Sequence, residues 1–278
     1  MASPLIRRFG ISRIHGSESE ATTDTVAAEE PLEIHVLHWF KDVPHAETLA
    51  VTMRTPGNDR ELVAGLLLSE GIIQRACEIS GIRNLGPGSS NEMLVELAKG
   101  ADFEGWRAAR TGFMSSSCGI CGKRSREFLE SQLPKAAPDE GFRVRADLIA
   151  GLPTLLAERQ VGFETTGGLH AAALIDPATG LVSMFEDIGR HNALDKLIGW
   201  AFLNGKIPLA RRVVFMSSRS SFELIQKAAM AGAPVLATIG GPSSLAIDTA
   251  RQCGMTLAGF IREGRFNIYS GEWRIHSK

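Results

Sequence analysis

The chain of 278 residues carries 30 Lys and Arg against 31 Asp and Glu, which gives a net charge of −1. Hydrophobic residues make up 44% of it, so a disordered scaffold is excluded for most of its length. The near-zero charge argues against a nucleic-acid-binding surface, and every apolar run is far shorter than the roughly 20 residues of a membrane helix. Four cysteines are too few to hold a fold of this size together by disulfides.

The first 30 residues are predicted to form a disordered tail. Residues 17–30 are rich in Ser, Thr, Glu and Ala and show no periodic apolar pattern. Arg7 and Arg8 are not followed by the apolar segment of a secretory signal, so we expect a cytoplasmic protein whose thiols stay reduced.

Residues 31–112 are predicted to form a small mixed α+β domain. Alternating apolar and polar residues predict four strands, over residues 32–40, 47–54, 81–85 and 93–97. Between the second and third strands, Asp59 is a predicted N-cap for a helix that runs to about Gly71.

Residues 136–278 are predicted to form an α/β domain. It begins with a helix over residues 147–159 and a hairpin of strands over 171–175 and 181–185. Strands and helices then alternate, with helices over 192–203, 222–231 and 245–252 and strands over 213–216, 235–239, 256–261 and 266–269. Such alternation implies crossover connections and a largely parallel sheet with helices on its faces.

Residues 113–135, between these domains, contain a Ser-rich loop with Cys118-Gly-Ile-Cys121 and a predicted helix over 123–133. Unpaired N–H groups and the dipole at the start of that helix would stabilise a thiolate, and Lys123 and Arg124 add positive charge. Because the thiolate is the form that attacks sulfur, this cysteine pair is the strongest candidate for a reactive group.

Other interpretations of the cysteine pair remain open from the residues alone. A closed zinc site needs a second Cys/His pair, and none is present at close spacing. A thioredoxin-like redox pair normally follows a strand, whereas this pair follows a Ser-rich linker. A zinc deaminase needs an upstream His-x-Glu, but His170-Ala-Ala lies downstream and has no Glu. Cys77 and Cys253 have apolar neighbours and are predicted to be core residues.

Three polar loops follow predicted strands, at residues 187–191, 217–221 and 240–244. Ligands of open α/β sheets bind at the carboxyl ends of strands, where helix N-termini and small residues favour phosphate. We therefore predict a site for a phosphate-bearing ligand, although helix capping by Ser and Gly explains each loop on its own equally well. The candidate contacts are Arg190, His191, Ser217 and Arg219.

Together these stretches resemble the FdhD family of formate dehydrogenase accessory sulfurtransferases. The resemblance covers residues 31–278 and is specific, because it combines several distinct motifs. The motifs are Ser117-Cys-Gly-Ile-Cys-Gly122, Thr166-Gly-Gly-Leu-His170, Glu186-Asp-Ile-Gly-Arg-His-Asn-Ala-Leu-Asp-Lys196, Ser217-Ser-Arg-Ser-Ser-Phe-Glu223 and Gly259-Phe-Ile-Arg-Glu-Gly-Arg-Phe-Asn-Ile-Tyr269.

The resemblance implies a cytidine-deaminase-like mixed sheet flanked by helices, with a smaller α+β domain. It implies that Cys118 carries a persulfide and that Cys121 is its partner. The cofactor-binding segment of the family corresponds to Phe260, Ile261, Arg262, Glu263, Gly264 and Arg265.

The resemblance also implies the partners. Sulfur would come from a cysteine desulfurase and pass to the bis-molybdopterin guanine dinucleotide form of the molybdenum cofactor, before that cofactor enters the formate dehydrogenase apoenzyme. A homodimer is expected, and a structural metal is not. The alternative function is a cofactor-binding chaperone without sulfur transfer.

Overall fold

The computed structural model describes residues 5–86, 91–103, 133–134 and 141–277. Cys118, Cys121 and residues 123–132 of the helix predicted after them lie outside these ranges. Among the helices of the described ranges, none has the length and apolar character needed to cross a membrane.

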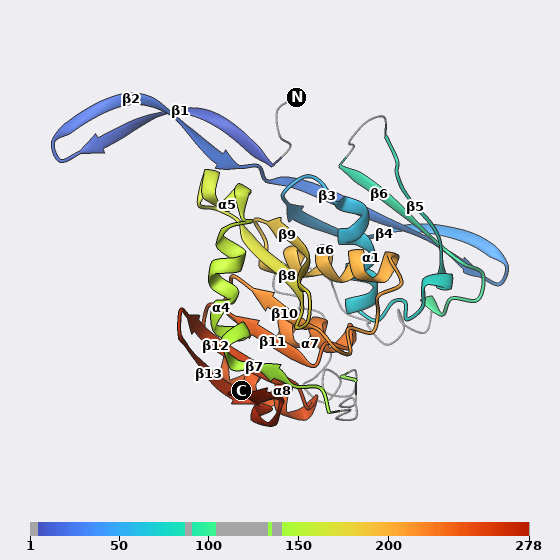
Figure 1. Ribbon diagram of the computed structural model, residues 1–278. Helices are drawn as coiled ribbons and strands as arrows, with labels where there is room; N and C mark the ends of the chain where they lie inside the picture. The colour runs from blue at the N-terminus through green and yellow to red at the C-terminus, as the bar shows by residue number, and fades with distance from the viewer. Residues whose placement is uncertain (1–4, 87–90, 104–132, 135–140, 278) are drawn as a thin grey trace.

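A six-stranded mixed sheet forms the centre of the molecule (Figure 1). Its strand order is β13-β12-β11-β10-β8-β9. The bounds are β8 (His170–Asp176), β9 (Gly180–Asp187), β10 (Val213–Met216), β11 (Val235–Thr238), β12 (Thr256–Arg262) and β13 (Arg265–Ser270). Parallel pairing of neighbouring strands is limited to β10, β11 and β12, because β8–β9 and β12–β13 are hairpins and β8 pairs antiparallel with β10. The predicted mixed α/β class is confirmed, whereas the expectation of a largely parallel sheet holds only for these three central strands.

Helices cover both faces of this sheet. Strand β10 shows how, since Val214 and Met216 pack in one core cluster and Val213 and Phe215 in another. The first cluster includes residues of α6 (Arg190–Leu203), α7 (Phe222–Met230) and α8 (Ser244–Gln252). The second includes residues of α4 (Ala146–Ala157), which is followed by the short α5 (Val161–Thr166).

A second sheet of four strands lies on the far side of α6. Its order is β4-β3-β6-β5, with β3 (Glu30–Phe40), β4 (Val43–Arg54), β5 (Ile79–Asn84) and β6 (Glu92–Leu97). Helix α1 (Asp59–Ser69) packs between this sheet and α6. The remaining elements are small: η1 (Ala76–Glu78), η2 (Glu272–Arg274), and β7 (Val144–Arg145) paired with β14 (Ile275–His276).

The contact between α1 and α6 is made by backbone. A Cβ at Gly65 would lie 1.8 Å from the carbonyl oxygen of Asp195, and one at Gly199 would lie 1.8 Å from that of Glu61. Two glycines therefore let the helices touch, and one apolar cluster runs through both sheets across the predicted boundary between the domains.

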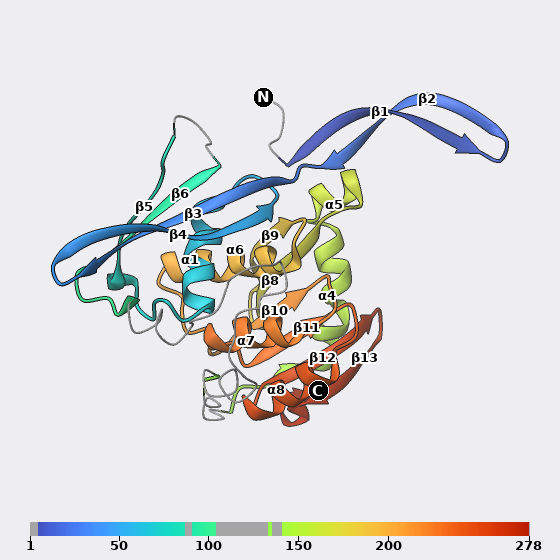
Figure 2. The ribbon, with the colours of Figure 1, turned by 180° about the vertical axis from the view of Figure 1, so that it is seen from behind.

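The predicted disordered tail is wrong for residues 6–27. They form an antiparallel hairpin of β1 (Ile6–His15) and β2 (Glu18–Ala27), which stands away from the body of the molecule (Figures 1 and 2). The segment contains several β-branched residues, which favour strands. Gly16, at a φ of 63°, provides the left-handed backbone that the two-residue turn requires.

Candidate functional site

The predicted polar loops meet at one edge of the central sheet. Strands β9, β10, β11 and β12 run in the same direction, so their carboxyl ends lie together. Backbone hydrogen bonds join two of the loops: Gly240 N–H donates to Ser218 at 3.0 Å, and Ser243 N–H donates to Ser220 at 3.0 Å. This edge is the place where ligands bind in open α/β sheets.

Two adjacent glycines allow the loops to pack this closely. A Cβ at Gly240 would lie 2.7–2.9 Å from atoms of Arg219, and one at Gly241 would lie 2.5 Å from the ring of Phe260. The loop after β11 is therefore pressed between the loop after β10 and the end of β12. The Gly-Gly sequence has a packing reason here that does not depend on any ligand.

The segment from Phe260 to Arg265 forms the end of β12 and its turn into β13. Phe260 has a left-handed backbone, with φ at 52°, and its side chain is half exposed. It lines a hollow of about 250 Å³ with Arg262, Arg265 and Asn267. Ile261 points to the opposite face and is fully buried in the core.

Arg262 and Arg265 are opposite each other in the register of the β12–β13 hairpin, so they lie on the same face of it. Arg262 Nη1 donates to the carbonyl oxygens of Ile239 and Ile261, both at 2.8 Å. Asn267, which sequence reasoning missed, follows Arg265 at a spacing of two, and this strand period puts both on one face. The hollow thus offers an aromatic face, two cations and an amide, a combination that suits a nucleoside diphosphate.

A second group of predicted residues lies where β9 leads into α6. His191 Nε2 is 3.1 Å from Glu223 Oε2, which also accepts a hydrogen bond from Ser221 at 3.3 Å. Burial lowers the pKa of His170, and the neighbouring Arg190 and His191 lower it further. The predicted residues Arg190 and His191 are therefore close to His170 at the same edge of the sheet.

Ser217 has a structural contact. Its hydroxyl accepts a hydrogen bond from Ala171 N–H at 2.9 Å, which joins the end of β10 to β8. Of the loop 217–221, Arg219 is the exposed residue.

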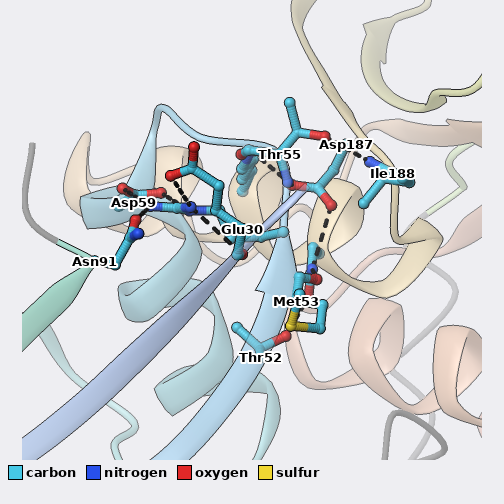
Figure 3. A network of polar contacts seen from close by, with 11 residues as sticks. Glu30, Thr52, Met53, Thr55, Asp59, Asn91, Asp187 and Ile188 are labelled. Carbon is cyan, nitrogen blue, oxygen red and sulfur yellow. Dashed lines mark hydrogen bonds and ion pairs between the residues drawn. The ribbon is translucent and has the colours of Figure 1, made fainter. Parts of the chain in front are cut away.

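Several residues of the motif over 186–196 make contacts within the fold, and Figure 3 shows part of this network. Asp187 and Lys196 are fully buried and form an ion pair at 2.7 Å. Asp187 also accepts a hydrogen bond from the Thr55 N–H at 3.2 Å, and Lys196 donates one to the Thr55 carbonyl oxygen at 2.9 Å. Asn192 donates to the carbonyl oxygen of Met53 at 2.8 Å. The motif therefore ties α6 to the end of β4 and leaves Arg190 and His191 at the sheet edge.

The same network extends to the start of β3. Arg54 is fully buried and pairs with Asp59 through two contacts, at 2.8 and 2.9 Å. It also donates to Asn91 at 2.9 Å and lies 3.8 Å from Glu30 (Figure 3). Glu30 in turn pairs with Arg7.

A further buried ion pair joins three helices. Lys227 of α7 lies 2.8 Å from Asp195 of α6, and both bind the hydroxyl of Ser69 in α1 at 2.8 Å. Sequence reasoning missed these ion pairs. The signal available was two adjacent charges, Asp195 and Lys196, between apolar residues of one predicted helix.

The two cysteines predicted to be in the core differ in their exposure to solvent. Cys253 is buried as predicted, and burial raises the pKa of its thiol to about 11. The prediction is wrong for Cys77, which is exposed because η1 lies at the surface. Within the described ranges, His, Cys, Asp and Glu form no group of three that could hold a metal ion.

Nearly the whole chain is similar to known proteins of one family. The sequence profile of the FdhD/NarQ family matches residues 27–276. The "Sulfur carrier protein FdhD" of Streptomyces avermitilis is 43% identical over 275 residues, covering 96% of this chain and 95% of that protein. The protein of the same name from Nocardia farcinica is 41% identical over 283 residues, covering 100% and 97%.

One solved structure gives a likeness in fold. It is described as a formate dehydrogenase accessory protein from Desulfotalea psychrophila, and it matches with a TM-score of 0.75. The match covers 98% of this chain and 100% of that chain, at 23% sequence identity.

Proposed function

Because the chain belongs to the FdhD/NarQ family, we propose that it is a sulfur carrier required for formate dehydrogenase activity. It takes sulfur from a cysteine desulfurase as a persulfide on Cys118 and transfers it to bis-molybdopterin guanine dinucleotide. The observation that carries the proposal is the family match, which spans the cysteine pair and the hollow at the sheet edge.

Loading is a thiol exchange. The Cys118 thiolate attacks the outer sulfur of the desulfurase persulfide, a new S–S bond forms, and the desulfurase cysteine leaves as a thiolate. The positive charge of Lys123 and Arg124 favours the Cys118 thiolate that this step requires.

Release uses the second cysteine. Cys121 attacks the Cys118 sulfur, and the outer sulfur leaves as hydrosulfide while a Cys118–Cys121 disulfide forms. The hydrosulfide, with a proton, replaces an oxygen ligand of the molybdenum substrate, which leaves as water. A cellular thiol then reduces the disulfide, so the cycle takes place in the cytoplasm.

The sheet edge holds the cofactor as substrate. Phe260 would stack on guanine, Arg262 and Arg265 would bind the diphosphate, and Asn267, which also lines the hollow, would contact the base. Arg190, His191 and Arg219 would extend this site along the edge. Ser217, Glu263 and Gly264 shape its loops, and Ile261 supports the strand from the core side. The fold is proposed to be cytidine-deaminase-like, and the working form a homodimer that delivers the cofactor to the formate dehydrogenase apoenzyme.

Mass spectrometry tests the sulfur step directly. After incubation with L-cysteine and a cysteine desulfurase, the protein should gain the mass of one sulfur atom on the peptide that contains Cys118. The Cys118→Ala variant should gain none. The matched control is Cys77→Ala, which removes an exposed thiol elsewhere and should load normally.

A cellular assay separates this function from the chaperone alternative. Cys118→Ala should abolish formate dehydrogenase activity, and Cys121→Ser should leave a loaded persulfide that is not released. If Cys118→Ala keeps full activity while replacement of Arg262 and Arg265 abolishes it, the protein is a cofactor chaperone and the sulfur proposal is wrong.

A further inference from the structure

Strands β1 and β2 with their turn form an arm that projects from the body (Figures 1 and 2). The two strands pair over ten residues each, so the arm is about 33 Å long. Neither strand pairs with any other strand of the described ranges. An isolated two-stranded sheet is marginally stable in water, so we expect another surface to cover the arm.

The arm presents apolar side chains. Phe9 and Val26 are 52% and 37% exposed. They lie on the same face, because Phe9 is paired with Asp24 and Val26 with Arg7 in the strand register. We call this face the charged face, because it also carries charged residues of both strands.

The charged face has opposite charge on its two strands. Side chains of one face alternate along a strand, so Arg7, Arg13 and His15 of β1 share it with Glu18, Glu20 and Asp24 of β2. No acidic residue occurs in β1, and no basic residue occurs in β2. A surface with one basic and one acidic strand is complementary to itself under a two-fold rotation.

We propose that the charged face of the arm docks on the charged face of the same arm in a second copy of this chain. Edge-to-edge pairing with two-fold symmetry would bring β1 beside β1 or β2 beside β2, which places like charges together. A two-fold axis parallel to the strands stacks the faces instead. It sets β1 of each copy over β2 of the other, so that arginines face carboxylates and the apolar groups are covered.

The base of the arm is fixed to the body, which reduces the entropy lost on docking. Ala28 N–H donates to Leu5 at 2.9 Å, and Arg7 pairs with Glu30. Helix α5 lies against β2, where Ala27 is 3.5 Å from the position of a Cβ at Gly168.

The area of the arm sets the strength of the dimer. One face of a two-stranded ribbon of this length covers about 330 Å², below the roughly 800 Å² per partner of a standard interface. We therefore expect a dimer of micromolar affinity that weakens as salt rises.

The inference rests on the proposed homodimer and not on the proposed sulfur transfer. The family match begins at residue 27, at the last residue of β2, so the arm lies outside the matched range. An experiment that contradicts the contact between arms would therefore leave the proposed sulfur transfer untouched, and the reverse also holds.

Sedimentation at low salt tests the proposal with two charge-reversed arms. The acidic arm carries Arg13→Glu and His15→Glu, and the basic arm carries Glu18→Lys and Glu20→Lys. Each variant alone should dimerise at least about tenfold more weakly than the natural chain, and an equal mixture should form heterodimers. The matched control is Arg8→Glu, a reversal on the opposite face, which should leave the dimer intact.

Three results would contradict the proposal. If the natural chain is a monomer at about 100 µM, far above a micromolar Kd, both the homodimer and the arm contact are wrong. If both reversed variants dimerise normally, the homodimer stands but uses another surface. If both are monomers that fail to associate when mixed, the charged faces do not contact each other.

Discussion

At the scale of single residues, Phe260 and Gly241 depend on each other. Phe260 holds a left-handed backbone, which is costly for a residue with a side chain and is often found at functional sites. Its ring occupies the space that a Cβ of residue 241 would need. The glycine is thus what allows the aromatic ring to lie at the hollow with its face half exposed.

The substitution Gly241→Ala should weaken binding of GDP, the nucleotide portion of the proposed cofactor. The new Cβ would lie 2.5 Å from the Phe260 ring and must displace it. Loss of stacking costs about 1–3 kcal/mol, so we expect Kd to rise by about fivefold to 150-fold. Isothermal titration calorimetry measures this.

A double-variant cycle supplies the control. In a Phe260→Ala background the ring is already gone, so Gly241→Ala should have little further effect on GDP binding. Equal losses in both backgrounds would show that the glycine acts through something other than the ring.

Part of the candidate site could be predicted from the sequence. The strand end and tight turn that hold Arg262 and Arg265 are a local pattern, but only the resemblance to the FdhD family singled these two residues out. Both line the hollow, and their binding of a cofactor stays a prediction. The partners of Asp187 and Lys196 could not be predicted, since Thr55 is more than 130 residues away and only the fold brings it close. A motif gives residue types, but the tertiary contacts decide which of them stay available to a ligand.

At the scale of elements, the crossing of α1 and α6 fixes how the two sheets sit. Gly65 and Gly199 bring backbone against backbone, and the Asp195–Lys227 pair closes the same junction from α7. Because the atoms in contact are backbone atoms, a side chain here cannot be accommodated by a change of rotamer.

Replacing Gly199 with Ala should destabilise the protein. The added Cβ would lie 1.8 Å from the carbonyl oxygen of Glu61, so the helices must separate. We expect a loss of about 3 kcal/mol or more in the free energy of unfolding, measured by urea denaturation.

Gly151→Ala is the matched control for that substitution. Gly151 lies inside α4, and a Cβ added there would have nothing within 4 Å, so alanine should stabilise the helix by about 0.5–1 kcal/mol. A similar loss for both substitutions would mean that close contact is not the cause.

The strand and helix pattern of residues 170–270 could be predicted closely. Strand β10 begins and ends as predicted, because four apolar residues between polar turns leave little choice. The arm could not be predicted in this way, because it has no buried face and therefore no periodic apolar pattern. Register and strand direction at the sheet edges also depend on tertiary pairing that local sequence does not specify.

At the scale of the whole molecule, one of the two apolar clusters packs against both sheets. Ile34 of β3, Leu67 of α1, Leu197 of α6 and Leu236 of β11 belong to a single apolar cluster and are fully buried. Two domains with separate cores could unfold separately, but here the four-stranded sheet has its buried residues in the cluster that it shares with the central sheet, and only the cluster on the α4 face belongs to the central sheet alone.

The chain should therefore unfold in one cooperative transition. Trp39 lies in β3 and Trp200 in α6, so variants that keep only one of these tryptophans report on the two sheets separately. Their fluorescence midpoints in urea should coincide, and the far-UV circular dichroism midpoint should agree with both. Midpoints that differ would show two independent units. A fragment of residues 136–278 gives a second measure: without α1 it exposes the apolar side of α6 and loses part of the shared cluster, so its near-UV circular dichroism should be weaker than that of the intact chain.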